Sequence, residues 1–458
     1  MRIELPAKVK YVLDTIAEAG FEAYAVGGCV RDSVLGRQPN DWDITTSAMP
    51  GRIKGLFRHT IDTGIAHGTV TVMIGSEGFE VTTYRIDGKY KDGRHPEKVT
   101  FTPSLTEDLK RRDFTINAMA YNEKEGLVDL YGGLEDIRNR KIRCVGEAKE
   151  RFGEDALRMM RAVRFSAQLG YDIEDKTMEA IRMLATNMKK ISAERIAAEL
   201  NKLVESDHPD YVEKLYTSGI CDVVLPEFSK AMQTPQNHPS HGITVGEHSL
   251  RAMTNVPPQK ELRLTMLFHD IGKPIVRSTD AAGVDHFYGH ADAGAGMAEK
   301  ILRRLRYDNH TIDVVKKLVF FHDYGIGTRP DARMVRRAVN KIGEELFPML
   351  LIVRRADILA QNEDSREEKL EVLSLWEELY QELLKKQDCV SLKDLALSGK
   401  DLIAMGMKPG REIGETLQML LEYVLEEPER NRKEVLLKYV PEVQGRGRKE
   451  VQNISWKK

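Results

Sequence analysis

Gly27-Gly28-Cys29-Val30-Arg31-Asp32, followed closely by Asp41-Trp42-Asp43, is the stretch of sequence that decides the fold of the N-terminal part. The two glycines end an apolar run, residues 23–26, and open a segment that predicts a helix. The residues from 41 to 46 predict a strand, and alternate residues of a strand point to the same face. We therefore expect Asp41 and Asp43 to project together toward the glycine turn.

Paired carboxylates beside a glycine turn suit the binding of two divalent metal ions around a nucleotide triphosphate. Gly27 and Gly28 let backbone N–H groups approach phosphate oxygens closely. A surface turn is the alternative explanation of the two aspartates, and it leaves the upstream glycines without a role. Glu80 lies in another predicted strand, and it becomes a third acidic ligand if that strand lies beside Asp41 and Asp43.

Basic and polar residues near these acids are candidates for contacts to the nucleotide. Arg31 follows the glycines closely and is expected to steady the triphosphate. Arg112 is expected to contact phosphate, with Asp113 and Asn117 organising the sugar pocket. In most proteins such a run of charges is only a solvated helix end.

The chain has 458 residues, which predicts several domains and a sizeable core. Strand-like segments, rich in Val, Thr and aromatic residues, end near residue 150, and helical spacing dominates afterwards. We expect an α+β protein in which an α/β head precedes an all-α neck and body. The predicted segments are 1–150 (head), 151–225 (neck), 226–365 (a histidine-rich part) and 366–458 (a helical tail).

Composition excludes several classes of protein. Charged residues are 31% and nearly balanced, at a net charge of −2, so composition alone gives no sign of nucleic-acid binding. The four cysteines are widely scattered, which argues against a disulfide framework or a zinc knuckle. No apolar run approaches the ~20 residues that span a bilayer, and the N-terminus lacks the apolar core of a signal peptide. We expect a cytoplasmic protein with no membrane partner.

Five motifs in order resemble those of class II tRNA nucleotidyltransferases, the CCA-adding enzymes and their bacterial poly(A) polymerase relatives. They are Gly-Gly-x-Val-Arg-Asp with Asp-x-Asp (27–43), Arg-Arg-Asp-Phe-Thr-Ile-Asn-Ala (111–118), Asp129 with Gly132-Gly133 and Asp136-Ile137, Glu154-Asp155-Ala156-Leu157-Arg158, and Glu194–Leu200. The resemblance is dense over 21–206. It implies a polymerase beta-like head, Mg²⁺ held by Asp41 and Asp43, and tRNA, CTP and ATP as partners.

Asp155 and Arg158 are three positions apart, so we expect them to share a helix face. Cytosine and adenine each present an amino donor beside a ring-nitrogen acceptor, which a carboxylate and a guanidinium complement. Uracil and guanine reverse that pattern and leave buried groups unpaired, which costs roughly 10⁴–10⁵ in selectivity in favourable cases. The resemblance implies that this pair selects C and A. Arg161 and Arg164 extend the row and are expected to contact triphosphate or pack the pocket.

A second constellation of ligand side chains follows the break near residue 240. Its members are His248, His269, Asp270, His290, His322 and Asp357. An adjacent His-Asp pair, with a histidine upstream and an aspartate far downstream, resembles HD-domain phosphohydrolases. The resemblance implies a divalent transition metal, with phosphohydrolysis of RNA ends or nucleotides. A purely structural role for the same residues is the alternative.

The sequence therefore predicts template-independent addition of C, C and A to tRNA 3′ ends, with a second, hydrolytic site. A polar loop at residues 87–96 resembles the loop associated with adding the terminal A. A poly(A) polymerase and an A-adding enzyme remain alternatives because the motifs are shared. A metal-dependent phosphohydrolase whose head merely binds nucleotide is an alternative of another class.

Overall fold

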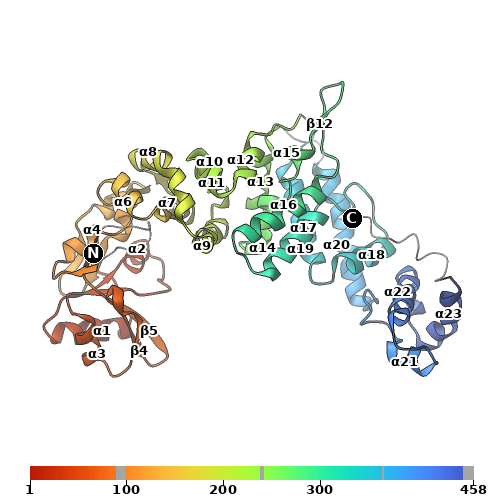
Figure 1. Cartoon of the computed structure of the whole chain (residues 1–458), viewed down its shortest axis with the longest axis horizontal. Helices are drawn as coiled ribbons and strands as arrows, with labels where there is room; N and C mark the ends of the chain where they lie inside the picture. Colours follow the sequence, from red (N-terminus) through yellow and green to blue (C-terminus); the bar gives the residue numbers. More distant parts are fainter. Residues whose placement is uncertain (89–98, 238–241, 364–365, 447–458) are drawn as a thin grey trace. The chain divides into compact units, whose positions relative to one another are not determined.

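The computed structural model describes residues 1–88, 99–237, 242–363 and 366–446, and it divides into two compact units (Figure 1). The first unit comprises Met1–Met232 with Ile301–Tyr307, and the second comprises Gln233–Lys300 with Asp308–Lys458. The predicted head and neck fall together in the first unit, and the histidine-rich part and the tail fall mostly in the second. The four-part division stays a prediction.

The first unit opens with a mixed α/β region and continues in helices, so the predicted α+β class is confirmed. Its main elements are α1 (Ala7–Glu18), β1 (Ala23–Val26), α2 (Gly28–Val34), β2 (Ile44–Thr46), α3 (Pro50–Leu56), β3 (Thr60–Gly64), β4 (Thr69–Ile74), β5 (Glu77–Thr83), β6 (Arg85–Asp87), β7 (Val99–Phe101), α4 (Leu105–Lys110), β8 (Met119–Asn122), β9 (Gly126–Asp129), α5 (Gly133–Arg138), β10 (Lys141–Ile142), α6 (Ala148–Glu154), α7 (Leu157–Leu169), β11 (Asp172–Ile173), α8 (Asp175–Leu184), α9 (Ala193–Val204), α10 (Val212–Thr217), α11 (Cys221–Val224) and α12 (Pro226–Gln233).

The head is built on one seven-stranded sheet, in the order β3-β4-β5-β2-β1-β8-β9. All neighbours are antiparallel except β2 and β5, which run parallel with Ile44 opposite Val81. β2 is shorter than predicted, because it begins at Ile44 and leaves both aspartates just before it. Asp43 still continues the pairing, since its carbonyl accepts a hydrogen bond from Val26 N at 2.9 Å.

The two faces of this sheet differ, and the difference positions the acids. Ile44 and Val81 point into a core with α1 and α3, represented by Ile16 and Ile53. Residues one step away along each strand point to the opposite face. There Thr45 donates a hydrogen bond to the buried carboxylate of Asp108 in α4, at 3.1 Å. Asp43 and Glu80 have the same strand parity as Thr45, so they lie on the α4 side.

The neck corrects one expectation from the sequence. α7 begins at Leu157, so Asp155 does not lie within the same helix as Arg158. Asp155 is extended at the break after α6, with φ −139° and ψ 105°. Its side chain accepts a hydrogen bond from Leu157 N at 3.0 Å, and its carbonyl accepts one from Arg158 N at 3.0 Å. Asp155 therefore caps the first turn of α7, which keeps it one turn away from Arg158.

The second unit is almost entirely helical. Its elements are α13 (Val245–Thr254), α14 (Lys260–Phe268), α15 (Lys273–Val276), β12 (Ser278–Thr279), β13 (Asp285–His286), α16 (His290–Arg304), α17 (Asn309–Phe321), α18 (Ala332–Ile342), α19 (Phe347–Ala360), α20 (Arg366–Lys386), α21 (Gly399–Ala404), α22 (Arg411–Glu426) and α23 (Lys433–Arg446), the last turn of α16 being grouped with the first unit. Trp376 is the largest fully buried side chain, and it packs with α17–α20. Arg336 is buried and donates to the carbonyl of Leu425 at 2.8 Å, which ties α18 to α22.

Two general expectations can be compared with the structure. The four cysteines are buried free thiols. Within the described ranges, every helix is too short or too polar to cross a membrane.

Candidate functional site

The glycine turn brings the first and second motifs together. Gly27 has φ +85°, a conformation that favours glycine. Its N–H donates to the carbonyl of Met119 at 3.1 Å. A Cβ at this position would lie 3.0 Å from Nη1 of Arg112, so the missing side chain makes room for that guanidinium. Gly28 begins α2 directly afterwards.

The acidic residues lie where β2 and β5 run side by side. The pairing of Ile44 with Val81 places Asp43 next to Glu80, and both side chains, with Asp41, are exposed. Burial by surrounding protein raises the pKa of Asp43 even though the side chain keeps accessible surface. Arg112 opposes this shift, and the charges of Glu80 and Asp41 add to it. The pKa of Asp43 is therefore raised in part by the negative charges of the other two acids.

These three carboxylates stay apart. Among the described residues, the groups of three ligands whose atoms lie within 4.8 Å of one another are both in the second unit. Three anions held close together without a cation would repel one another. Carboxylate oxygens are nevertheless the ligands that Mg²⁺ prefers, so these residues suit that ion.

Arg31 and Asn117 connect the two motifs directly. The Arg31 side chain is buried, and its Nη1 donates to Oδ1 of Asn117 at 2.7 Å. Its Nε donates to Asp32 at 2.9 Å. The amide of Asn117 donates in turn to Asp113 at 3.3 Å. The predicted phosphate and sugar residues are therefore brought together, with Arg31 engaged by protein partners.

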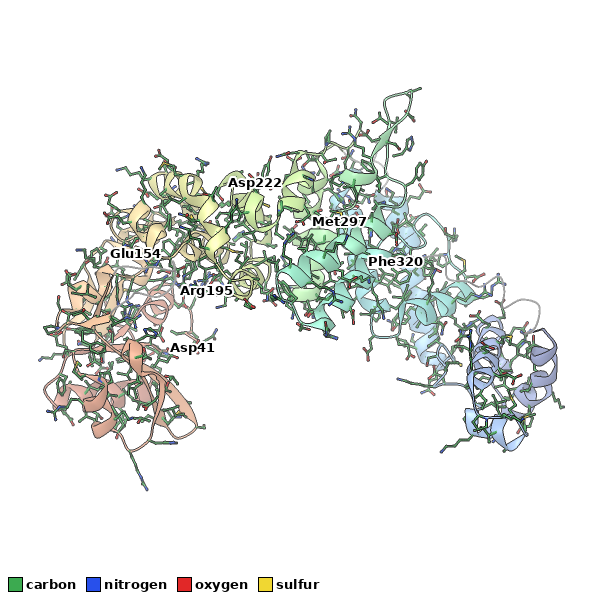
Figure 2. All side chains as sticks on the ribbon, viewed as in Figure 1. Asp41, Glu154, Arg195, Asp222, Met297 and Phe320 are labelled. Atoms are coloured by element: carbon green, nitrogen blue, oxygen red, sulfur yellow. The ribbon has the colours of Figure 1, made fainter. Side chains whose placement is uncertain are left out.

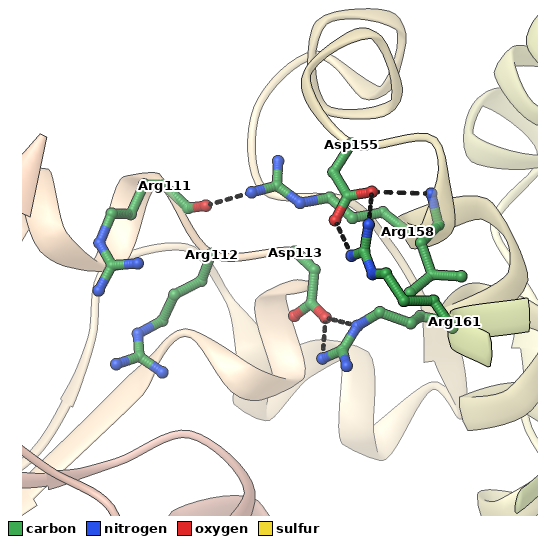
Figure 3. A pocket seen from close by; sticks show the side chains of 8 residues that line it. Arg111, Arg112, Asp113, Asp155, Arg158 and Arg161 are labelled. Carbon is green, nitrogen blue, oxygen red and sulfur yellow. Dashed lines mark hydrogen bonds and ion pairs between the residues drawn. The ribbon is translucent and has the colours of Figure 1, made fainter. Parts of the chain in front are cut away.

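A cavity of about 270 Å³ lies where the second, fourth and fifth motifs meet (Figure 3). Its lining consists of five arginines, two aspartates and one leucine: Arg111, Arg112, Arg158, Arg161, Arg195, Asp113, Asp155 and Leu157. This excess of guanidinium groups suits a polyanionic ligand such as a triphosphate. The lining residues come from the segment after α4, from the α6–α7 junction and α7, and from α9; Figure 2 labels Glu154 and Arg195 in the last two regions.

The predicted base-selecting residues both lie in this cavity, and each is held by other groups. Both oxygens of Asp155 accept from Arg195, at 3.3 and 2.6 Å. Arg158 pairs with Glu154 at 2.5 Å and donates to the carbonyls of Arg151 and Arg111, at 3.2 and 3.1 Å. These bonds orient both side chains before any ligand arrives.

Arg161 and Arg164 have different surroundings. Arg161 lines the cavity and donates two hydrogen bonds to Asp113, at 2.8 and 2.6 Å. Burial alone would raise the pKa of Asp113, but Arg161 brings it far below its ordinary value. Arg164 is buried, pairs with Glu199 at 2.7 Å and lies over the ring of Phe165. Arg164 is therefore a packing residue of the neck and does not line the cavity.

Arg195 lies in the fifth motif, but neither it nor Arg111 or Leu157 was among the predicted site residues. It lies on α9, 40 positions after Asp155. A helical pattern shows only that it belongs to a helix, and it gives no distance to Asp155. Arg111 was equally inconspicuous in a charged run. The loop at 87–96 lies for the most part outside the described residues.

The six residues of the histidine-rich segment converge inside the second unit. They form two groups, His248 with His269 and Asp357, and Asp270 with His290 and His322. Asp270 lies between the groups: its Oδ2 is 3.3 Å from His269 Nε2, and its Oδ1 is 3.5 Å from His290 Nε2. His248, His290 and Asp357 lie in α13, α16 and α19, and the other three lie just after α14 and α17. The sequence alone could therefore not fix their geometry.

The hydrogen bonds of three histidines fix their tautomers. Nδ1 of His269, His290 and His322 each donates to the carbonyl three residues earlier, at 2.8, 2.9 and 2.7 Å. Nδ1 therefore carries a proton in each of them, and Nε2 points into the cluster. This is how a protein presents imidazole to a metal ion, so the donor set fits a divalent transition metal.

Charge in the cluster also favours a cation. Burial lowers the pKa of His248. Burial would do the same to His269, but the charges of Asp270 and Asp357 raise the pKa of His269 to about 10. The two buried carboxylates thus attract a positive charge.

The sheet-based head, with acids beside an arginine-lined cavity, defines a nucleotidyltransferase. The family described as "Poly A polymerase head domain" matches residues 23–143. "Probable RNA and SrmB- binding site of polymerase A" matches 170–232, and "tRNA nucleotidyltransferase domain 2" matches 290–440.

Individual relatives agree with these families. The chain is 37% identical over 418 residues to a CCA-adding enzyme of Lactobacillus helveticus, which covers 91% of this chain and 92% of the relative. It is 35% identical over 424 residues to one of Limosilactobacillus reuteri, with the same coverage. The fold resembles a Bacillus stearothermophilus CCA-adding enzyme in complex with CTP, with a TM-score of 0.71, 28% identity and coverage of 98% and 100% of the two chains. The chain belongs to the family of CCA-adding enzymes.

Proposed function

We propose that this chain adds C, C and A to the 3′ ends of tRNA, without a template, from CTP and ATP. The terminal ribose 3′-hydroxyl attacks the α-phosphate, the bond to the β-phosphate breaks, and pyrophosphate leaves. The observation that carries this proposal is the arginine-rich cavity that contains both Asp155 and Arg158. Full-length similarity to CCA-adding enzymes supports it.

Asp41, Asp43 and Glu80 are proposed to hold divalent metal ions, with Mg²⁺ the ion that carboxylates of this kind prefer. When bound, such ions would lower the pKa of the attacking hydroxyl and neutralise the leaving pyrophosphate. Arg112, beside Gly27, would donate to phosphate oxygens. Arg31 would act indirectly, by holding Asn117 and the sugar pocket in place.

Asp155 and Arg158 are proposed to select the base. A carboxylate has about four acceptor positions, so Asp155 can accept from the amino group of C or A while it stays bound to Arg195. Arg158 would donate to the neighbouring ring nitrogen, from the orientation that the carbonyls of Arg111 and Arg151 impose. Uracil and guanine would set acceptor against acceptor and donor against donor.

The experiment that tests this function uses three tRNA transcripts, ending at the discriminator base, at C and at CC. Each is incubated with the protein, Mg²⁺ and labelled CTP, ATP or both, and the products are sized on a gel. Growth of all three to one common CCA end supports the proposal. Growth only from the CC-ended transcript indicates an A-adding enzyme, and long ladders with ATP indicate a poly(A) polymerase.

A second function is proposed for the histidine cluster, favoured by the three fixed tautomers. We infer that a divalent transition metal binds there and supports hydrolysis of phosphate esters on nucleotides or RNA ends. Water adds across one P–O ester bond, so that the ribose oxygen leaves with a proton and the phosphate keeps the new oxygen. The test is metal content after chelator-free purification, together with phosphatase activity in Ni²⁺, Co²⁺ or Mn²⁺. Negligible metal and no activity would reject it.

A further inference from the structure

A cavity of about 460 Å³ opens beside the histidine cluster. This volume lies within the ~300–1,000 Å³ of small-molecule sites. His290 belongs both to the cluster and to the cavity lining, and it is the most exposed of the six ligand residues, at 16% of its side chain. Lys273 also lines the cavity, and its Nζ lies 2.7 Å from Oδ2 of Asp270. A molecule in this cavity would therefore lie next to the cluster, on its most accessible side.

Aromatic rings form one wall of this cavity. The rings of His286 and Tyr288 are stacked almost parallel, at 4° and 5.5 Å between centroids. Tyr288 is 80% exposed, which is the highest exposure among the large hydrophobic side chains of the described residues. Phe287 lies between them in the chain, and the ammonium of Lys273 is 5.3 Å from the centre of its ring. The wall thus presents an open aromatic face with positive charge near the cluster.

The wall is held by the hairpin of β12 and β13 (Figure 1). Asp280 accepts from the backbone N–H groups of Ala282 and Val284, both at 2.9 Å, and pairs with His286 at 2.9 Å. Asp285 is buried, and it pairs with Arg277 at 3.0 Å. These contacts fix His286, and hence the plane on which Tyr288 stacks.

The wall and the cluster meet in one cavity, because His286, Tyr288 and His290 all line it. Tyr288 and His290 are separated by Gly289 alone, which has φ +78°, so their Cα atoms lie within about 7 Å. A phosphate at His290 would leave its ribose in the cavity and its base at the level of Tyr288. Stacking on an exposed aromatic ring accepts every base, since each has a π face.

We propose that Tyr288, supported by His286, is the base-binding residue of the histidine-cluster site, whose substrates are nucleoside phosphate esters and not simple phosphates. This inference rests on the hydrolytic function proposed above for that cluster. It adds a determinant of specificity outside the ligand residues.

The test uses the full chain loaded with Ni²⁺ and two matched substrates. One is adenosine 2′,3′-cyclic monophosphate, and the other is the baseless analogue methyl riboside 2,3-cyclic phosphate. In Tyr288→Ala, we expect KM for the nucleotide to rise about tenfold, the size of a lost base stack, with kcat and the baseless reaction unchanged. Tyr288→Phe keeps the ring and should behave as wild type. Leu384→Ala, an exposed apolar residue of α20, is the control.

A binding measurement separates failure of the subsite from failure of catalysis. Calorimetric titrations measure how tightly adenosine 2′-monophosphate and inorganic phosphate each bind to the wild type and to Tyr288→Ala. Tenfold weaker nucleotide binding in Tyr288→Ala, with phosphate binding unchanged, supports the subsite. If the protein also hydrolyses neither substrate, the subsite stands and only the proposed hydrolytic function fails. The subsite proposal is overturned if the wild type hydrolyses both substrates equally well. It is also overturned if the wild type and Tyr288→Ala bind the nucleotide with the same affinity.

Discussion

The two proposed metal sites, the acids of the head and the histidine cluster of the second unit, are built in opposite ways. Asp41, Asp43 and Glu80 are exposed and form no tight group, beside the central strands β2 and β5. The six ligand side chains of the histidine cluster are mostly buried and lie close together, and backbone carbonyls hold three of its imidazoles. An open acid site suits an ion that arrives with a nucleotide, whereas a closed nitrogen-rich site suits a resident ion. The two proposed sites therefore present ligand sets that suit different ions.

Removing an acid from the head should give the largest effect. Asp43→Ala is expected to reduce nucleotide incorporation by about 10³-fold or more, because metal stabilisation of phosphoryl charge amounts to several kcal/mol. Gel-resolved incorporation measures the loss, and tRNA binding should persist. Asp62→Ala, an exposed acid of β3 paired with Lys54, is the control. Full activity in Asp43→Ala would remove this residue from the catalytic site.

Base selection should respond next. Arg158→Ala is expected to raise UTP incorporation relative to CTP by about 10²-fold. Without the guanidinium, the N–H of uracil no longer faces another donor in the pocket, so uracil loses less than it does in the wild type. Competition between the two labelled nucleotides measures the ratio. Arg182→Ala in α8 is a matched neck arginine. If selectivity stays at the wild-type value, Arg158 does not pair with the base.

Arg195 should have a smaller effect, through Asp155. Without the two-point contact, the Asp155 carboxylate is held, within the described residues, only by the hydrogen bond from Leu157 N. Arg195→Ala is expected to raise KM for CTP about tenfold and to weaken discrimination against UTP, at little cost in kcat. Arg195→Lys keeps the charge without the planar fork and should recover the activity only partly. If Arg195→Ala lowers the Tm but leaves KM for CTP normal, Arg195 has only a structural role.

Chelation should give the smallest change, and it should affect only the histidine cluster. A metal present at about 100 times its Kd stabilises by about 2.7 kcal/mol, which corresponds to roughly 5–10 °C in Tm for a unit of this size. Scanning calorimetry with and without EDTA measures the shift. His269→Ala should abolish the EDTA effect. An unchanged Tm in wild type would mean that no resident ion stabilises the cluster.

The same contrast explains what the sequence could predict. Motif order indicated the family, because spacing within each motif is local. The start of β2 was misplaced by three residues, because Asp41-Trp42-Asp43 has strand-like alternation but only Asp43 joins the pairing. The sequence carries little signal for β3, because its residues are mostly exposed and show no alternation. The partnership of Asp155 with Arg195 could not be predicted, because it depends on how α7 packs against α9.

The most direct test of the account measures both activities in parallel on two variants, Asp43→Ala and His269→Ala. CCA addition is followed on a CC-ended transcript, and hydrolysis is followed on adenosine 2′,3′-cyclic monophosphate with Ni²⁺. The account predicts that Asp43→Ala loses only addition and that His269→Ala loses only hydrolysis. Loss of both activities in either variant, with the protein still folded, would contradict two independent metal sites.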